Sequence, residues 1–300
     1  MKRTLIVKFI LTICIIGLTA TLKAQNSPCP NFDFSQRNFT NWRCQIYKSP
    51  YYSYLTSYSN LTLIDTTPII GRHTIMTNFS GYDQYTRNGY PNSQLKLIPD
   101  GFFQSARVGN DSTKSDADAI IFPLTVDSSN ALLLLHYAIV LNDASHYPNY
   151  QPRFELRIQD SNRNLINGIY NSYTAIADMP GFICSSSQLQ WKDWSTIGID
   201  LSPVIGQSIN ILCFVSDCGH GGHFGYGYFI GECRGIGIQV LNCAEDDTAR
   251  LEAPNGFVSY IWRDSVLTIV GNNQLLKVYN PPHKARYSCL VTNALGDTSL

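Results

Sequence analysis

The chain has 300 residues, and its 22 lysine and arginine residues are balanced by 22 aspartate and glutamate residues. This balance excludes the basic surface on which electrostatic binding of nucleic acid or anionic lipid depends. Charged residues make up only 15% of the chain and aromatic residues 12%, with 18 tyrosines, which excludes a disordered or coiled-coil protein and favours β-structure.

The N-terminal segment is typical of an export signal. A positively charged start precedes a mostly apolar run from Leu5 to Leu22, and Ala24 offers a small-residue cleavage site. A retained membrane anchor is the competing interpretation, because the run is about long enough to cross a bilayer. Lys8 interrupts the run, however, and polar sequence follows at once, so we predict that residues 1–24 are a cleaved signal peptide.

Cleavage would remove four basic residues and no acidic ones, which leaves 18 basic against 22 acidic residues and a net charge of −4. We therefore expect an exported protein, extracellular or at the cell surface. We expect no transmembrane span after cleavage and no nucleic-acid partner.

Cysteine usage indicates disulfide bonds. One of the nine cysteines lies in the signal, and an even count of eight in an exported chain favours disulfides over thiolate chemistry. Spacing leaves the connectivity open, but we favour Cys29–Cys44 and Cys218–Cys233, because short loops close at a low entropic cost. The eight candidates are Cys29, Cys44, Cys184, Cys213, Cys218, Cys233, Cys243 and Cys289.

Short apolar or alternating runs, bounded by Asn, Asp, Gly, Ser and Pro, predict β-strands. Phe154, Leu156 and Ile158 alternate with polar residues and share one face. The run from Ala131 to Leu141 is nearly continuous, as in a strand buried on both faces, although a buried helix gives the same pattern. Regularly spaced strands suggest a β-sandwich. The predicted strands are Asp118–Val126, Ala131–Leu141, Arg153–Gln159, Thr196–Leu201 and Ser208–Ser216.

Residues 243–300 are typical of a second, smaller domain. Cys243, Trp262 and Cys289 are spaced as in an immunoglobulin-type sandwich, in which the tryptophan lies in the core. Tyr287 stands two residues before Cys289, where that fold places its tyrosine corner. The chain stops about where a last strand should form, so a truncated domain is one alternative.

The stretch CGHGGHFGYGYFIGEC, residues 218–233, could hold zinc through Cys218, His220, His223 and Cys233. The spacing fits a zinc site poorly, and oxidation outside the cell removes the thiolates that a metal needs. We favour a glycine-rich turn and an aromatic strand tied at both ends by a disulfide. His220 and His223 are then hydrogen-bonded turn residues, and a catalytic cysteine is excluded by the same disulfide.

Aromatic side chains offer a binding surface. Tyr226 and Tyr228 alternate with glycines on one face of the predicted strand and could stack on a sugar, as could Trp191 and Trp194, which flank a turn. Core packing is the alternative for both tryptophans. Asp217, with nearby backbone oxygens, is a candidate ligand for calcium, and we expect no other cofactor.

Catalysis finds little support in the sequence. A glycosidase needs two carboxylates that meet across the substrate. Asp193, Asp200, Asp217 and Glu232 are scattered, and nothing in their spacing brings two of them together. We therefore name no catalytic residue.

Ordered motifs at residues 103–111, 136–160 and 194–233 resemble a repeated extracellular module of secreted and surface proteins of Bacteroidetes, often found beside PKD or immunoglobulin-like domains. Residues 29–42 resemble the opening of that module. Similar modules often have Asp where this chain has Gly231, so a calcium ligand would be missing here.

The resemblance implies a jelly-roll sandwich of the kind shared by MAM and lectin-like domains. The predicted chain is thus all-β, with a jelly-roll module over residues 25–242 followed by an immunoglobulin- or PKD-like sandwich over residues 243–300. The expected function is adhesion or binding of a glycan or an extracellular protein of the matrix, without catalysis. A structural spacer is the alternative, and a glycoside hydrolase is a distant third.

Overall fold

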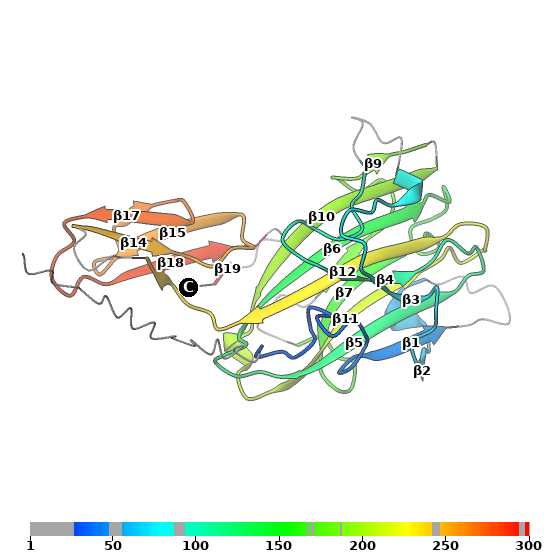
Figure 1. The fold of residues 1–300 in the computed structure, drawn as a ribbon, viewed down its shortest axis with the longest axis horizontal. Helices are drawn as coiled ribbons and strands as arrows, with labels where there is room; N and C mark the ends of the chain where they lie inside the picture. The colour runs from blue at the N-terminus through cyan, green and yellow to red at the C-terminus, as the bar shows by residue number, and fades with distance from the viewer. Residues whose placement is uncertain are drawn as a thin grey trace, which may run out of the picture.

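A computed structural model gives the protein's fold as strands joined by turns and three short 3-10 helices (Figure 1). The all-β prediction is therefore confirmed. The signal peptide and Cys243 lie outside the described residues. None of the helices in the described part of the chain has the length and apolar character of a membrane span. The structure describes residues 27–47, 56–86, 94–166, 169, 172–186, 188–241, 247–293 and 298–299.

Two six-stranded antiparallel sheets form the larger sandwich, and each lists its strands here in spatial order. The first contains β2 (Ile64–Thr66), β1 (Arg43–Tyr47), β5 (Ala117–Thr125), β11 (Ser208–Ser216), β7 (Arg153–Gln159) and β8 (Ser172–Ala175). The second contains β3 (His73–Met76), β4 (Ser105–Gly109), β12 (Gly225–Arg234), β6 (Leu132–Asn142), β10 (Leu189–Asp200) and β9 (Ile183–Cys184).

The connections between these sheets are those of a jelly roll. The chain changes sheet at each step from β4 to β7, forms the β7–β8 pair, and changes sheet again at each step from β10 to β12. Eight strands wound in this way place β4-β12-β6-β10 over β5-β11-β7-β8. The jelly-roll prediction is confirmed.

Apolar side chains of both sheets fill the space between them. Phe154, Leu156 and Ile158 of β7 lie in this core, as their alternation predicted. In β6, Leu133 and Leu135 face the core, while Val140 joins a second buried cluster on the outer face of the same sheet. Burial on both faces explains why the sequence of β6 is nearly continuous in apolar residues.

The smaller sandwich packs a three-stranded sheet against a four-stranded one. Trp262 is completely buried in its core beside Leu251 and Cys289, in keeping with the immunoglobulin-like prediction. The strands are β13 (Gln239–Val240), β14 (Thr248–Glu252) and β17 (Leu275–Tyr279) in one sheet, and β16 (Ile269–Gly271), β15 (Ser259–Asp264), β18 (Tyr287–Thr292) and β19 (Thr298–Ser299) in the other.

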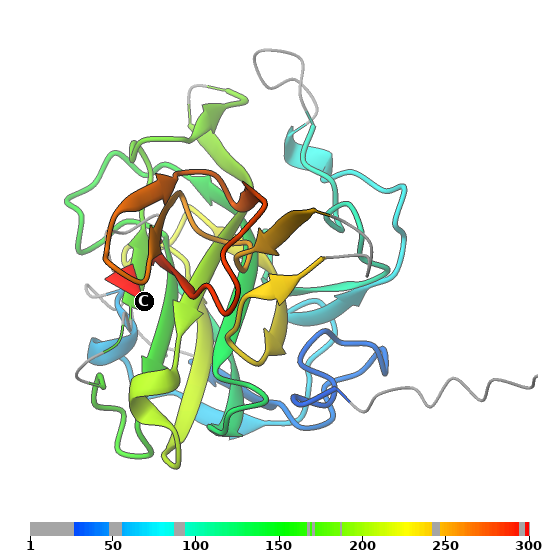
Figure 2. The same cartoon turned by 90° about the vertical axis from the view of Figure 1, so that its left-hand side faces the viewer.

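The two sandwiches touch along the edge of β10. The Gly198 N–H donates to the Gly256 carbonyl of the smaller sandwich at 2.9 Å. Figure 2 shows the smaller sandwich in front of one end of the larger one. β13 precedes residue 242, so strand pairing of the smaller sandwich begins before the boundary expected from the sequence.

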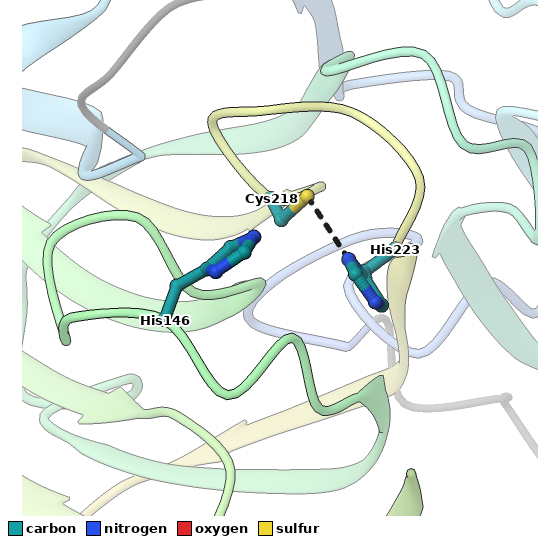
Figure 3. A group of neighbouring side chains, drawn as sticks. All are labelled: His146, Cys218 and His223. Atoms are coloured by element: carbon teal, nitrogen blue, oxygen red, sulfur yellow. Dashed lines mark hydrogen bonds between the residues drawn. The ribbon is translucent and has the colours of Figure 1, made fainter.

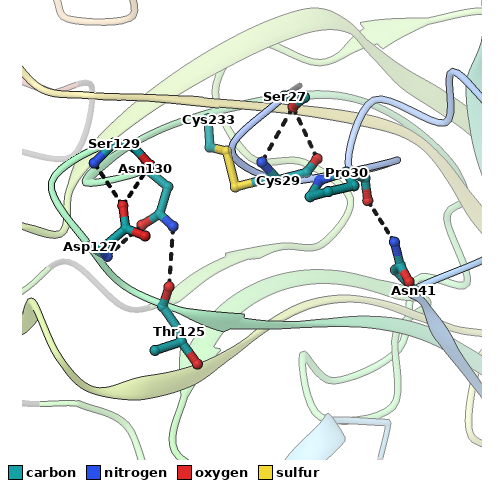
Figure 4. The surroundings of a disulfide bond; sticks show 9 residues. All are labelled: Ser27, Cys29, Pro30, Asn41, Thr125, Asp127, Ser129, Asn130 and Cys233. Atoms are coloured by element: carbon teal, nitrogen blue, oxygen red, sulfur yellow. Dashed lines mark hydrogen bonds between the residues drawn. A yellow bond between two sulfur atoms is a disulfide. The ribbon is translucent and has the colours of Figure 1, made fainter. Parts of the chain in front are cut away.

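The preferred disulfide pairings are wrong. Cys29 bonds Cys233, 204 residues away, at the C-terminal end of β12 (Figure 4). The N-terminal turns lie against that strand because Gly231 leaves room for the Phe32 ring. Loop length raises the entropic cost of closure only slowly, so the preference for short loops was a weak guide. Among the described cysteines, five are thiols, namely Cys44, Cys184, Cys213, Cys218 and Cys289.

Candidate functional site

Two loops meet at the end of the larger sandwich opposite the disulfide. One joins β6 to β7 (residues 143–152) and the other joins β11 to β12 (residues 217–224). Three histidine rings gather here, with the ring centre of His146 lying 4.8 Å from that of His220 and 5.6 Å from that of His223. We call the surface formed by these two loops the histidine end.

Asp217 anchors the base of the second loop. Its carboxylate is buried and accepts backbone N–H groups from Gly225 (3.2 Å), Asp116 (3.1 Å) and Lys114 (3.4 Å). Burial raises the pKa of this carboxyl well above its usual value. Both oxygens thus serve N–H donors of the chain itself, which gives Asp217 a structural role in place of the calcium role considered from the sequence.

A tight turn then folds His223 back over Cys218. The Cys218 N–H donates to the His223 carbonyl at 3.0 Å, and the intervening Gly221 and Gly222 have φ values of 72° and 93°. Glycine is needed in this left-handed region because other side chains are strained there. As a result, His223 Nδ1 lies 3.5 Å from Cys218 Sγ.

Titration at this turn favours neutral side chains. Burial raises the pKa of the Cys218 thiol, so the thiol is protonated at neutral pH. Burial and then the neighbouring His146 lower the pKa of His223, so its imidazole keeps a free lone pair.

The first loop is held from inside by Gln151. Its buried amide donates to Asp143 Oδ1 at 2.8 Å and to the His146 carbonyl at 3.2 Å, while its oxygen accepts the Ala144 N–H at 3.0 Å. The backbone that carries His146 is therefore fixed before any ligand arrives. Sequence reasoning missed His146, because it lies more than 70 residues from the cysteine–histidine stretch.

A pocket of about 620 Å³ opens beside these loops. The Tyr147 side chain is 79% exposed, and its ring centre lies 6.4 Å from that of Tyr150, which in turn lies 5.1 Å from His220. Edge-on aromatic rings and two imidazoles thus share one accessible surface. The pocket is lined by Ser145, His146, Tyr147, Pro148, Tyr150 and His220.

The tyrosines and tryptophans proposed from the sequence lie elsewhere, and three of them are buried. Tyr226, Tyr228 and Trp191 face out from their sheet, but the segment between β3 and β4 covers them, with Leu95 in the same cluster. Both tyrosine hydroxyls donate to Asp83 Oδ2 at 2.7 Å. Burial raises the pKa of both tyrosines. Side chains enclosed in this way cannot stack on a ligand, so that interpretation is wrong.

Trwo structural contacts explain the position of the remaining tryptophan. Trp194 is partly buried against the same cluster, and its indole N–H donates to the Lys96 carbonyl at 2.8 Å. Trp194 therefore helps to hold the covering segment on the sheet, as the core-packing alternative expected.

Carboxylates in the described structure are engaged separately. Glu232 contacts His136 at 3.0 Å and Arg234 at 3.4 Å, and the His136 hydrogen bond lowers the pKa of Glu232. Asp193 and Asp200 accept the backbone N–H groups of Trp194 and Ser202, each at 2.8 Å. Together with the buried Asp217, these contacts leave the four carboxylates considered from the sequence in separate local roles.

The zinc set considered from the sequence is not brought together. Cys233 bonds Cys29, whereas Cys218 remains a thiol beside His223, and His146 approaches from the other loop (Figure 3). The ligand atoms of His146, Cys218 and His223 all lie within 4.8 Å of one another. His220 lies next to this group, on the wall of the pocket.

No protein-family model and no curated protein matches the sequence. Among solved structures, the bacteriophage CBA120 tailspike protein 4 enzymatically active domain has a TM-score of 0.35 at 10% identity, covering 69% of this chain and 21% of that chain. TmCBM61 in complex with β-1,4-galactotriose has a TM-score of 0.33 at 10% identity, covering 68% and 96%.

A third similar structure is described as carbohydrate-binding modules from the β-sandwich superfamily, with a TM-score of 0.32 at 7% identity, covering 67% of this chain and 60% of that chain. The chain thus spans about a fifth of the length of the tailspike domain. At these TM-scores the likenesses carry no argument about function. The resemblance to Bacteroidetes surface modules stays a prediction.

Proposed function

We propose that the protein is an exported binding module that takes a glycan at the histidine end and has no catalysis of its own. The observation that carries this proposal is the pocket lined by Tyr147, Tyr150, His146 and His220. It lies on loops between the strands of a rigid jelly roll, where binding residues of such scaffolds are commonly placed.

The chemistry of the pocket suits a sugar. A sugar ring has an apolar face, which packs on an aromatic ring, and a rim of hydroxyls, which need donors and acceptors. The exposed Tyr147 ring can provide the first, and the His146 and His220 imidazoles can provide the second. The separate engagement of Asp193, Asp200, Asp217 and Glu232 supports binding over hydrolysis.

Export is supported by the covalent link between Cys29 and Cys233, since disulfides persist in oxidising compartments. We therefore retain the extracellular or cell-surface location as part of the proposal, with an extracellular protein as the alternative ligand.

A glycan-array screen of oxidised residues 25–300 tests this function. We expect binding to selected glycans that falls at least about tenfold in Tyr147→Ala, because loss of one stacked ring removes on the order of 1.4 kcal/mol. Tyr279→Ala is the matched control, since Tyr279 is 74% exposed but lies on the smaller sandwich. Absence of binding by folded protein, or equal losses in both variants, would contradict the proposed site and favour the spacer alternative.

A further inference from the structure

We propose that His146, Cys218 and His223 form a binding site for a transition-metal ion of the zinc class. The proposal does not depend on glycan binding. It rests on three donor atoms from two loops that meet within 4.8 Å of one another (Figure 3). Two imidazole nitrogens and one thiolate sulfur are ligands that zinc prefers, and three protein ligands leave a fourth position for water.

Pairing of Cys29 with Cys233 is what makes this site available. The objection to zinc from the sequence was that Cys218 would be half of a disulfide. In the structure Cys218 is a buried thiol, and the metal-ligand group around it contains two histidines and no second cysteine. A thiol enclosed in this way is protected from oxidation and retained for coordination.

The distances already approach those of a coordinated metal. Zinc bonds of ordinary length at a tetrahedral angle separate a sulfur and a nitrogen ligand by about 3.6 Å. Cys218 Sγ and His223 Nδ1 are 3.5 Å apart. His146 completes the set from the opposite loop, so the closure needed is a side-chain adjustment of about 1 Å.

Both loops are held in place by contacts outside the ligand set. Gln151 fixes the backbone of His146 through its carbonyl, and Asp217 fixes the residue next to Cys218. Such surrounding contacts reduce the ordering cost of binding, as outer contacts do in known metal sites.

The proton balance of binding is simple. The Cys218 thiol donates to the Gly221 carbonyl at 3.0 Å when no metal is bound. On binding, the sulfur lone pair bonds the metal and the thiol proton passes to solvent, while each histidine contributes the lone pair of a neutral imidazole. Binding of one divalent ion therefore releases one proton and weakens as the pH falls.

Cobalt titration of oxidised residues 25–300 tests the site, in a Cys184→Ser background that removes the exposed thiol. We expect one equivalent of Co²⁺ to produce a thiolate-to-cobalt charge-transfer band in the near ultraviolet, which one equivalent of Zn²⁺ then abolishes. Cys218→Ser should remove the band. His146→Ala and His223→Ala should each weaken binding by more than about tenfold.

His283→Ala is the matched control, because His283 is exposed on the smaller sandwich and should leave the titration unchanged. Circular dichroism of each variant checks that the fold is retained. A band that persists in Cys218→Ser, or no band in folded protein, overturns the proposal.

Tyr147→Ala separates this inference from the proposed function. It should remove glycan binding and leave the cobalt band intact, because Tyr147 is not among the metal ligands. Failure of glycan binding alone thus leaves the metal site standing, and failure of the cobalt titration alone leaves the pocket standing.

Discussion

The two ends of β12 treat cysteine in opposite ways. At the C-terminal end, Cys233 is bonded to Cys29 and lies next to the aromatic turns that open the module. At the N-terminal end, Cys218 is a thiol that contacts His223 and Gly221. One end is closed covalently, whereas the other holds a group with lone pairs to offer.

Strand geometry explains the difference. β12 has 10 residues, and at about 3.3 Å per residue its ends are about 33 Å apart. Disulfide-bonded cysteines need Cα atoms within about 7 Å. An extended strand between Cys218 and Cys233 therefore excludes the bond that their short spacing suggested. Closeness along the chain is a poor guide wherever the intervening residues form a strand.

The largest expected effect is loss of the closed end. Cys233→Ser should lower the free energy of unfolding by about 5 kcal/mol, the chain-entropy value for a loop of this length. Urea denaturation measures the change, and the Cys29→Ser, Cys233→Ser double variant should lose no more than the single one. Cys184→Ser, at an exposed thiol, is the control. Additive losses in the two variants would contradict a bond between these residues.

Next in size is an acid sensitivity beside the histidine end. His73 is buried and its Nδ1 accepts the Ile69 N–H, so the imidazole must be neutral. Burial lowers the pKa of His73 to about 4. Because this value lies below that of the unfolded chain, the neutral ring stabilises the fold above about pH 6.5. That stability is lost as the pH falls towards 4, by about 3 kcal/mol.

Urea denaturation between about pH 7 and pH 4 checks this expectation by comparing the wild type with His73→Gln, which lacks the titrating group. The difference between variants is the appropriate quantity, since burial raises the pKa of the neighbouring Asp118 to about 7 and its effect has the opposite sign. Parallel pH profiles for the two proteins would show that His73 does not titrate in this way.

A smaller effect should come from filling the space that admits the aromatic turns. A methyl group at Gly231 would fall on the Phe32 ring, so Gly231→Ala should cost about 1–3 kcal/mol through overpacking. Gly237→Ala is the control, since nothing lies within 4 Å of the added atom. Combining Gly231→Ala with Phe32→Leu should give less than the sum of the two losses. Equal effects at both glycines would argue against the described packing.

The smallest effect should come from the open end. In metal-free protein, Cys218→Ser should change the free energy of unfolding by less than about 1 kcal/mol, because the serine hydroxyl can donate to the same Gly221 carbonyl. Urea denaturation of this variant, beside Cys233→Ser, gives the direct comparison of the two cysteines. A loss of several kcal/mol would mean that Cys218 carries a structural role like that of Cys233.

Local patterns predicted the strands well. The expected strands Arg153–Gln159 and Ser208–Ser216 are β7 and β11 to the residue, and Trp262 is in the core of the smaller sandwich as expected. These features depend on period-two alternation and on turn residues within a few positions, so a single stretch of sequence contains the information.

Features that depend on distant segments were missed. Tyr226 and Tyr228 alternate with glycine as an exposed platform would, but Asp83, 143 residues before Tyr226, caps both hydroxyls. His146 joins Cys218 only through the meeting of two loops. Alternation shows which residues share a face of a sheet, and it contains no information on what covers that face.

The bond between Cys29 and Cys233 also determines how the chain would carry a mechanical load. It joins the start of the jelly roll to the strand that leads into the smaller sandwich. Tension applied on either side of the module would pass through two sulfur atoms and bypass the sheets between them. The sandwich, with its histidine end, would stay folded under a pull that extends the rest of the chain.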